Sequence, residues 1–172
     1  MNLVLCGMMG SGKSTVGKHL ASHLSYEFVD TDEVLESRFG KITDIFARFG
    51  EEYFREKESE VCVELAKREG LVLATGGGLV LKKENVNCLK RSGTLIFLRA
   101  NPSTLAQRLQ ADVDRPLLQT EGDLEVRIAK LLQIRTPIYE SVADHILDVE
   151  GKTPEEIAEE IIEKLAVKAQ QV

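Results

Sequence analysis

The chain has 172 residues, of which 43% are hydrophobic and 29% are charged, and its formal net charge is −6. This composition is typical of one soluble globular domain and excludes a disordered chain, and the acidic balance disfavours binding of nucleic acid through its phosphates. No apolar run approaches the ~20 residues that a membrane-spanning helix needs.

Short apolar runs alternate with longer stretches of helical periodicity, which is typical of βαβ units around a parallel sheet. Between the first two runs, Val16, Leu20 and Leu24 repeat at helical spacing and predict a helix. The runs that predict buried strands are Leu3–Cys6, Glu27–Val29, Leu71–Ala74, Leu95–Leu98 and His145–Val149.

Two stretches interrupt this alternation. Residues 32–68 hold mainly helix without an intervening strand. Residues 110–122 are polar and contain a proline and a glycine, so they predict a long loop of the kind that often serves as a lid. We expect both stretches to be insertions in one domain over residues 1–172. The helices expected in the first stretch are Glu33–Phe39, Thr43–Phe49 and Glu51–Arg68.

The last helix has the clearest start. Thr153 is suited to cap it, Pro154 takes the first helical position, and Glu156 stands three residues after the cap. The sequence therefore predicts a helix that begins at Pro154. Its buried stripe is expected to consist of Ile157, Ile161, Ile162 and Leu165.

Residues 7–14 read GMMGSGKS and match the phosphate-binding pattern GxxxxGK[ST], directly after a strand and before an amphipathic helix. The glycines let backbone N–H groups turn toward a phosphate, and the helix directs its positive end at the same anion. We expect Lys13 to neutralise phosphate oxygens of a nucleoside triphosphate and the Ser14 hydroxyl to coordinate Mg²⁺. Thr15 follows in the first helical turn. The residues expected to contact nucleotide here are Gly10, Ser11, Gly12, Lys13, Ser14 and Thr15.

Asp30 and Asp32 end the second predicted strand, at the edge where the ligand crevice of an open α/β sheet lies. Strand alternation would turn both carboxylates to one side, one toward Mg²⁺ and one toward an acceptor hydroxyl. The alternative is that either aspartate only caps the next helix. The third strand ends in Thr75-Gly76, where many such proteins place a metal-bound aspartate, and no Asn-Lys-x-Asp element indicates guanine.

Three further features suit a small anionic substrate. Arg55 and Glu58 share a helix face, although a surface ion pair explains that spacing equally well. Residues 76–78 are glycines and provide backbone that a ligand can approach closely. Arg135, whose planar fork suits a carboxylate, precedes Pro137, which is expected to break or kink its helix.

Two arginines lie near the predicted lid. Arg115 is placed to stabilise charge that develops on a transferred phosphoryl group when the loop closes. Arg108, taken alone, is best interpreted as a solvated helix residue.

The motifs GMMGSGKST, Asp-Thr-Asp, FRxxE, TGGG, DRPLL and RxPxY occur in this order, and from Gly7 to about Pro154 the chain resembles a shikimate kinase. The resemblance implies an α/β fold, a three-layer α/β/α sandwich with a five-stranded parallel sheet. Its phosphate-loop kinase core would carry a shikimate-binding insertion over about residues 32–60 and a lid over about residues 110–122. It further implies ATP and Mg²⁺ as cofactors and phosphorylation of the shikimate 3-hydroxyl, giving 3-phosphoshikimate and ADP in chorismate and aromatic amino-acid biosynthesis.

The resemblance also assigns roles to residues. Glu58 would orient Arg55, and Asp32 would receive or orient the acceptor hydroxyl. The catalytic residues would be Lys13, Asp32 and Arg115. Mg²⁺ would be held by Ser14 directly and by Asp30 through water. Besides the phosphate loop, the nucleotide would meet Arg108, Arg115, Lys152 and Pro154. The shikimate set would be Asp32, Arg55, Glu58, Gly76, Gly77, Gly78 and Arg135.

Two other functions remain open from the residues alone. A kinase for another small acceptor, such as gluconate or a nucleoside monophosphate, would share the phosphate loop but would not need the two arginines and the glycine triplet together. A nucleotide-dependent switch or binding module without transfer chemistry would not need an arginine in a lid.

Cys6, Cys62 and Cys88 stand far apart and lack CxxC spacing, so we expect buried structural thiols in a reducing compartment rather than disulfides or a metal site. The N-terminus shows no charged-then-apolar leader, and a cytoplasmic location is therefore expected. We expect a monomer whose partners are small-molecule substrates, with no nucleic-acid or membrane partner.

Overall fold

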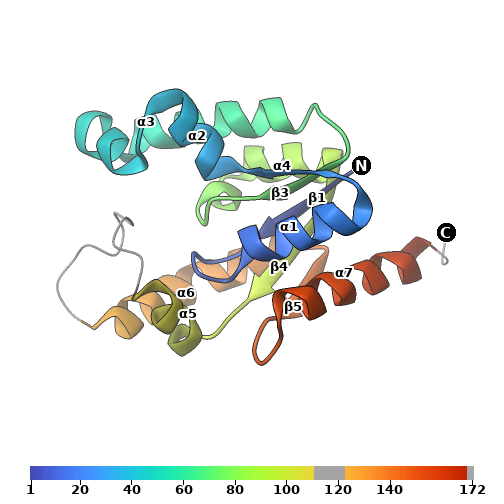
Figure 1. Ribbon diagram of the computed structural model, residues 1–172. Helices are drawn as coiled ribbons and strands as arrows, with labels where there is room; N and C mark the ends of the chain where they lie inside the picture. Colours follow the sequence, from blue (N-terminus) through green and yellow to red (C-terminus); the bar gives the residue numbers. More distant parts are fainter. Residues whose placement is uncertain (111–122, 170–172) are drawn as a thin grey trace.

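The computed structural model describes residues 1–110 and 123–169. Its centre is a sheet of five parallel strands in the order β2-β3-β1-β4-β5, with helices on both faces (Figure 1). The three-layer α/β/α sandwich is thus confirmed. The strands are β1 (Asn2–Cys6), β2 (Glu27–Asp30), β3 (Leu71–Ala74), β4 (Gly93–Arg99) and β5 (His145–Asp148).

The helices that the structure describes follow the strands in chain order. They are α1 (Lys13–Leu24), α2 (Thr31–Phe39), α3 (Ile42–Leu65), the short 3₁₀ helix η1 (Leu79–Leu81), α4 (Lys83–Ser92), α5 (Pro102–Leu109), α6 (Leu124–Val142) and α7 (Pro154–Ala169). No helix in the described ranges is both long and apolar enough to cross a membrane.

Strand alternation divides the core into two clusters, one on each face of the sheet. In β1, Leu3 and Leu5 face the cluster that includes α1, α5 and α7, whereas Val4 and Cys6 face the cluster built with α3 and α4. All four side chains are at most 2% exposed. Burial on both faces explains why this strand is a continuous apolar run rather than an alternating one.

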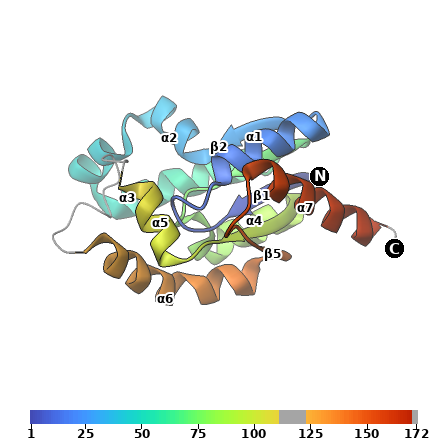
Figure 2. The same cartoon turned by 60° about the horizontal axis from the view of Figure 1, so that its bottom comes forward.

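The register of the strands aligns their carboxyl ends. Leu5 of β1 pairs with Ala74 of β3, and Ala74 also pairs with Asp30 of β2. The loops that follow these strands therefore leave the sheet at the same edge. Figure 2 shows α2 and α3 on one side of this edge and α5 and α6 on the other.

Gly50 lies at the boundary between the two helices that were predicted as Thr43–Phe49 and Glu51–Arg68 and that the structure joins as α3. Its φ of 81° and ψ of 175° are not helical, and the glycine interrupts α3 where the sequence predicted the boundary. Of the break or kink expected at Pro137, the break is wrong, because α6 continues through this proline to Val142. The helix is held on both sides of the proline, since Ile128 belongs to one core cluster and Tyr139 to the other.

The start of α7 confirms the predicted capping box. The Glu156 N–H donates to Thr153 Oγ1 at 3.2 Å, and the Thr153 N–H donates to a Glu156 carboxylate oxygen at 2.7 Å. Two N–H groups that the first helical turn leaves unbonded are satisfied in this way.

All three cysteines are free thiols, but the expectation that all three are buried is wrong for Cys88. Cys6 and Cys62 are buried, and Cys88 is partly exposed. No cluster of three or more metal-ligating side chains occurs in the ranges that the structure describes.

Burial predicts the chemical reactivity of two of these thiols. Loss of hydration raises the pKa of Cys6 and that of Cys62 to about 12 each, because the thiolate form is disfavoured away from water. At about pH 8 in native protein, a disulfide reagent such as Ellman's should therefore titrate Cys88 and leave the other two thiols unreacted, whereas unfolded protein should release all three. Rapid modification of two or three thiols in the folded state would contradict this.

Candidate active site

The phosphate loop, residues 7–12, leaves β1 at the aligned edge and leads into α1. Gly7, Gly10 and Gly12 have φ values of 138°, 80° and 95°, a region that glycine adopts without steric cost. The Lys13 ammonium bends back over the loop, donating to the Gly7 carbonyl at 3.0 Å and the Met8 carbonyl at 2.9 Å. The loop thus combines a helix N-terminus with a positive charge held at the same point, which is an anion-binding arrangement.

A cavity of about 290 Å³ opens beside this loop. It brings together most of the residues expected to contact nucleotide. Ser11 does not line this cavity, because it is fully buried. Its N–H donates a hydrogen bond of 3.1 Å to the Met8 carbonyl, so its role is to shape the loop. The cavity is lined by Met9, Gly10, Gly12, Lys13, Ser14, Thr15, Asp30, Asp32, Thr75, Gly77, Arg108 and Leu109.

Arg108 is more than a solvated helix residue. Its guanidinium donates to the Gly10 carbonyl at 3.1 Å, a contact between positions 98 residues apart, and the side chain lines the cavity. Lys152 instead pairs with Glu160, and neither Lys152 nor Pro154 lines this cavity. Arg115 lies outside the described residues.

Asp30 uses its two carboxylate oxygens for two different contacts. Oδ2 accepts a hydrogen bond of 2.6 Å from the Ser14 hydroxyl, and Oδ1 accepts the Asp32 N–H at 2.9 Å. The second contact is an N-cap for α2. The capping interpretation is therefore confirmed for Asp30, and the Mg²⁺ role expected of its other oxygen, which is bonded to Ser14, stays a prediction.

The expectation that alternation along a strand aligns Asp30 with Asp32 is wrong. β2 ends at Asp30, and Asp32 lies in the first turn of α2. Both side chains nevertheless line the cavity by the phosphate loop and a second, adjoining one. The sharp strand-to-helix turn, rather than strand alternation, produces this convergence.

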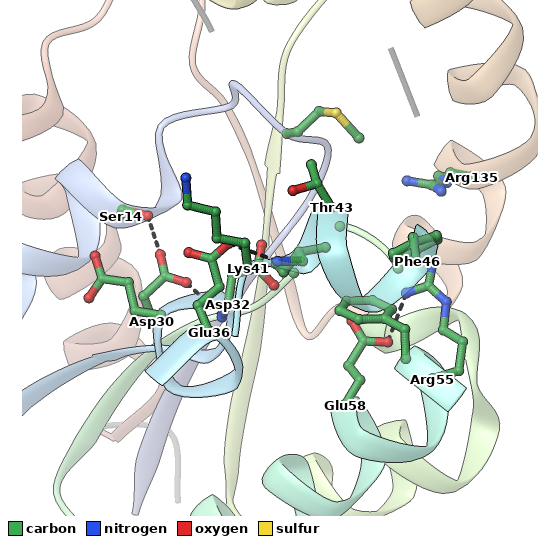
Figure 3. A pocket seen from close by; sticks show the side chains of 17 residues that line it. Ser14, Asp30, Asp32, Glu36, Lys41, Thr43, Phe46, Arg55, Glu58 and Arg135 are labelled. Carbon is green, nitrogen blue, oxygen red and sulfur yellow. Dashed lines mark hydrogen bonds and ion pairs between the residues drawn. The ribbon is translucent and has the colours of Figure 1, made fainter. Parts of the chain in front are cut away.

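The second cavity, of about 390 Å³, lies between α2, α3, α6 and the glycine triplet, which is residues 76–78 (Figure 3). It shares five residues with the first cavity, so the two sites meet at the serine–aspartate pair. Its lining residues are Met9, Ser14, Asp30, Asp32, Glu33, Glu36, Lys41, Ile42, Thr43, Phe46, Phe54, Arg55, Glu58, Gly76, Gly77, Gly78 and Arg135.

The Arg55–Glu58 pair is the buried anchor of this cavity, not a surface ion pair. Glu58 is 2% exposed and accepts a bond of 2.8 Å from the Arg55 guanidinium (Figure 3). Burial raises the pKa of Glu58, and the positive charge of Arg55 opposes that rise. Glu51 holds the other side of the same guanidinium at 3.2 Å. Arg55 is thereby fixed with its fork toward the cavity.

The glycine triplet forms the floor on which these side chains lie. A Cβ at Gly76 would come within 2.5 Å of Asp32 Oδ1, and one at Gly78 would come within 2.3 Å of the Arg55 guanidinium. At Gly77 the nearest atom would be Nη1 of Arg135, at 3.4 Å. The triplet therefore lets three charged groups from three helices converge, and any side chain at its ends would displace them.

The aromatic wall was missed by sequence reasoning. The rings of Phe46 and Phe54, one on each side of the interruption at Gly50, lie 4.8 Å apart and line the cavity. Their helical spacing is also that of core residues, so periodicity alone does not separate a ligand wall from a core. Lys41 and Thr43 also line the cavity, and they belong to no motif that could have identified them from the sequence.

Comparisons with known proteins agree with this geometry. Residues 9–166 match the family model described as shikimate kinase. A shikimate kinase of Thermodesulfovibrio yellowstonii is 48% identical over 164 residues, which cover 95% of this chain and 94% of that protein.

Two solved structures are also similar to this one. The shikimate kinase of Acinetobacter baumannii in complex with shikimate has a TM-score of 0.93 at 39% identity, covering 97% of this chain and 93% of that one. The shikimate kinase of Aquifex aeolicus has a TM-score of 0.82 at 37% identity, covering 99% of both chains. With the motifs that lie in the described residues converging on one cleft and the likeness extending over nearly the whole chain, this protein belongs to the shikimate kinase family.

Proposed function

We propose that the two adjoining cavities hold the two substrates of one transfer reaction. ATP occupies the cavity at the phosphate loop, and shikimate occupies the one between α2, α3 and α6. The reaction is phosphorylation of the shikimate 3-hydroxyl, giving 3-phosphoshikimate and ADP in chorismate and aromatic amino-acid biosynthesis. The observation that carries the proposal is that both cavities share Ser14, Asp30 and Asp32, so the γ-phosphate and the acceptor meet there.

Recognition of shikimate follows from the charges around its cavity. Arg55 and Arg135 present two guanidinium groups to one carboxylate, and arginine binds carboxylates through two parallel hydrogen bonds. Asp32, across the glycine triplet, accepts hydrogen bonds from ring hydroxyls. Phe46 and Phe54 supply an apolar wall for the carbon ring. A carboxylated polyol matches this set of cations, anion and apolar surface.

The residues around the phosphate loop supply positive charge to the nucleotide and orient its phosphates. The Lys13 ammonium, which here contacts two carbonyls of the phosphate loop, would exchange them for phosphate oxygens when nucleotide binds in that loop. Arg108 borders the nucleotide, and the role proposed for Arg115, which lies outside the described residues, is to stabilise the transferred phosphoryl group. In a loose transition state, positioning and neutralisation of charge provide most of the rate enhancement. Asp32 orients the attacking hydroxyl and receives its proton.

Ser14 and Asp30 suit Mg²⁺. Magnesium in nucleotide sites uses one or two protein oxygens and completes its shell with water and phosphates. The hydroxyl–carboxylate pair, 2.6 Å apart at the mouth of both cavities, offers that donor set. When bound, the ion neutralises charge on the β- and γ-phosphates. Ser14 would be the direct ligand and Asp30 would act through water.

The rival functions fit less well. A gluconate or nucleoside monophosphate kinase does not require Arg55, the glycine triplet and Arg135 in one cavity. A switch or binding module without transfer chemistry does not require an acceptor cavity that opens onto the phosphate loop.

Acceptor specificity tests the proposal directly. Purified protein with ATP and Mg²⁺ is assayed for ADP formation in the presence of shikimate, gluconate, quinate or a nucleoside monophosphate. ADP formation should depend on shikimate, and the product should carry phosphate on the 3-oxygen by ³¹P NMR. Turnover of gluconate or a nucleotide without turnover of shikimate would disprove the proposed function.

Asp30→Asn should lower kcat by roughly 10- to 100-fold and raise the Mg²⁺ concentration required, because the amide keeps the cap but loses the negative charge. The matched control is Asp123→Asn. Asp123 caps α6 through the same contact, with the N–H of the residue two positions on, but has no serine partner. Both variants should melt within a few degrees of the parent protein, and an unchanged Mg²⁺ dependence for Asp30→Asn would refute the assignment.

Arg135→Lys should raise the KM for shikimate by about tenfold or more, because an ammonium cannot replace the two parallel hydrogen bonds of a guanidinium. The KM for ATP should change little. Arg91→Lys, at an exposed position of α4, is the control and should leave both constants unchanged. Equal KM values for shikimate in parent and Arg135→Lys proteins would remove Arg135 from the proposed site.

A further inference from the structure

The glycine triplet has no side chains of its own with which to hold its place. It follows β3 and leads into η1, and Asp32, Arg55 and Arg135 all lie against it. A shift of this backbone by a few tenths of an ångström would move the floor of the shikimate cavity relative to those three groups. The groups that fix the triplet therefore influence how well the cavity fits its ligand.

Two buried hydroxyls hold the triplet from different elements. The Thr31 hydroxyl accepts a hydrogen bond of 2.9 Å from the Gly76 N–H. The Tyr139 hydroxyl donates one of 2.6 Å to the Gly77 carbonyl. Thr31 is 2% exposed and Tyr139 is fully buried. The two bonds act on consecutive glycines, one on a donor and the other on an acceptor.

Each hydroxyl also belongs to an element that carries a substrate-binding residue. Thr31 stands directly before Asp32 at the start of α2, and Tyr139 lies one helical turn after Arg135 in α6. The positive charge of the nearby Arg135 guanidinium opposes the rise in the pKa of Tyr139 that burial causes. The bonds to the triplet thus join β3, α2 and α6 at the point where their three functional groups meet.

The surroundings of Tyr139 favour a fixed donor. Its ring packs on Phe97 of β4, with centroids 5.0 Å apart. Burial raises the pKa of Tyr139 to about 12, so the hydroxyl keeps its proton and donates over the whole physiological range. A buried phenol normally has such a partner, and here that partner is the backbone of the cavity floor.

We propose that Thr31 and Tyr139 are positioning residues for the acceptor substrate. Their hydroxyls hold the glycine triplet in register with Asp32 and Arg135, so that shikimate meets a preformed floor. The inference rests on the proposed function, since shikimate is taken as the ligand of this cavity. Neither side chain lines the cavity, and each acts through the backbone that it holds.

Thr31→Val and Tyr139→Phe test the inference, because each removes the hydroxyl and preserves most of the shape. Loss of one of the two hydrogen bonds to the glycine triplet should raise the KM for shikimate about fivefold in each variant and lower kcat by a similar factor. The KM for ATP should stay within about twofold of the parent value. Thr31→Ser, which keeps the hydroxyl, should restore the KM for shikimate.

The matched controls make the same chemical changes at the opposite end of the sheet. Thr94→Val alters a buried threonine near the start of β4, and Tyr26→Phe alters a half-buried tyrosine just before β2. Both should leave the two KM values unchanged. Shikimate binding without ATP, measured by calorimetry at a temperature where every variant is folded, should weaken for Thr31→Val and Tyr139→Phe but not for the controls.

The possible outcomes separate the claims. If the parent protein phosphorylates shikimate but Thr31→Val and Tyr139→Phe only lower Tm and keep the parent KM and affinity for shikimate, the hydroxyls merely stabilise the fold and the inference is wrong. An equal rise in the KM for ATP would also contradict it. If the parent protein does not use shikimate, the proposed function fails, and the inference fails with it.

Discussion

The alignment of three parallel strands at one edge is the constraint on which the site depends. Pairing of Leu5 with Ala74, and of Ala74 with Asp30, brings the phosphate loop, the aspartate turn and the glycine triplet to the same level. These segments are well separated in the chain, and the alignment of the strand ends brings them together. A shift of one residue in this register would also turn buried side chains of β1 and β3 to the opposite faces, so core packing and site geometry are specified together.

The charges at this edge explain how an acidic protein is suited to two anions. The net charge of −6 is a property of the whole surface, whereas a ligand responds to the groups nearest to it. Arg55 is 25% exposed and is held by the buried Glu58, and Arg135 is only 6% exposed. A partly or fully buried cation has already lost part of its hydration before the ligand arrives, so less remains to be lost on binding.

The sequence was sufficient to predict the strands, the interruption at Gly50 and the capping box at Thr153, because each depends on local periodicity or on the chemistry of a few neighbouring residues. It was not sufficient where the outcome depends on packing between distant elements. The bond from Arg108 to Gly10 spans 98 positions, and spacing alone left the Arg55–Glu58 pair indistinguishable from a surface ion pair. Asp32 was placed on the correct side for an incorrect reason, since a turn into α2 rather than strand alternation orients it.

The glycine triplet shows why such a site is hard to infer from motifs alone. A run of glycines indicates that ligand or side chains approach the backbone, but glycine is also the residue with the most conformational freedom to lose. The precision of the floor must then come from groups elsewhere, and here the hydroxyls of Thr31 and Tyr139 provide it. Tyr139 belongs to the RxPxY motif and Thr31 to the Asp-Thr-Asp motif. Each motif thus combines a charged residue that lines the cavity with a hydroxyl that holds the glycine triplet.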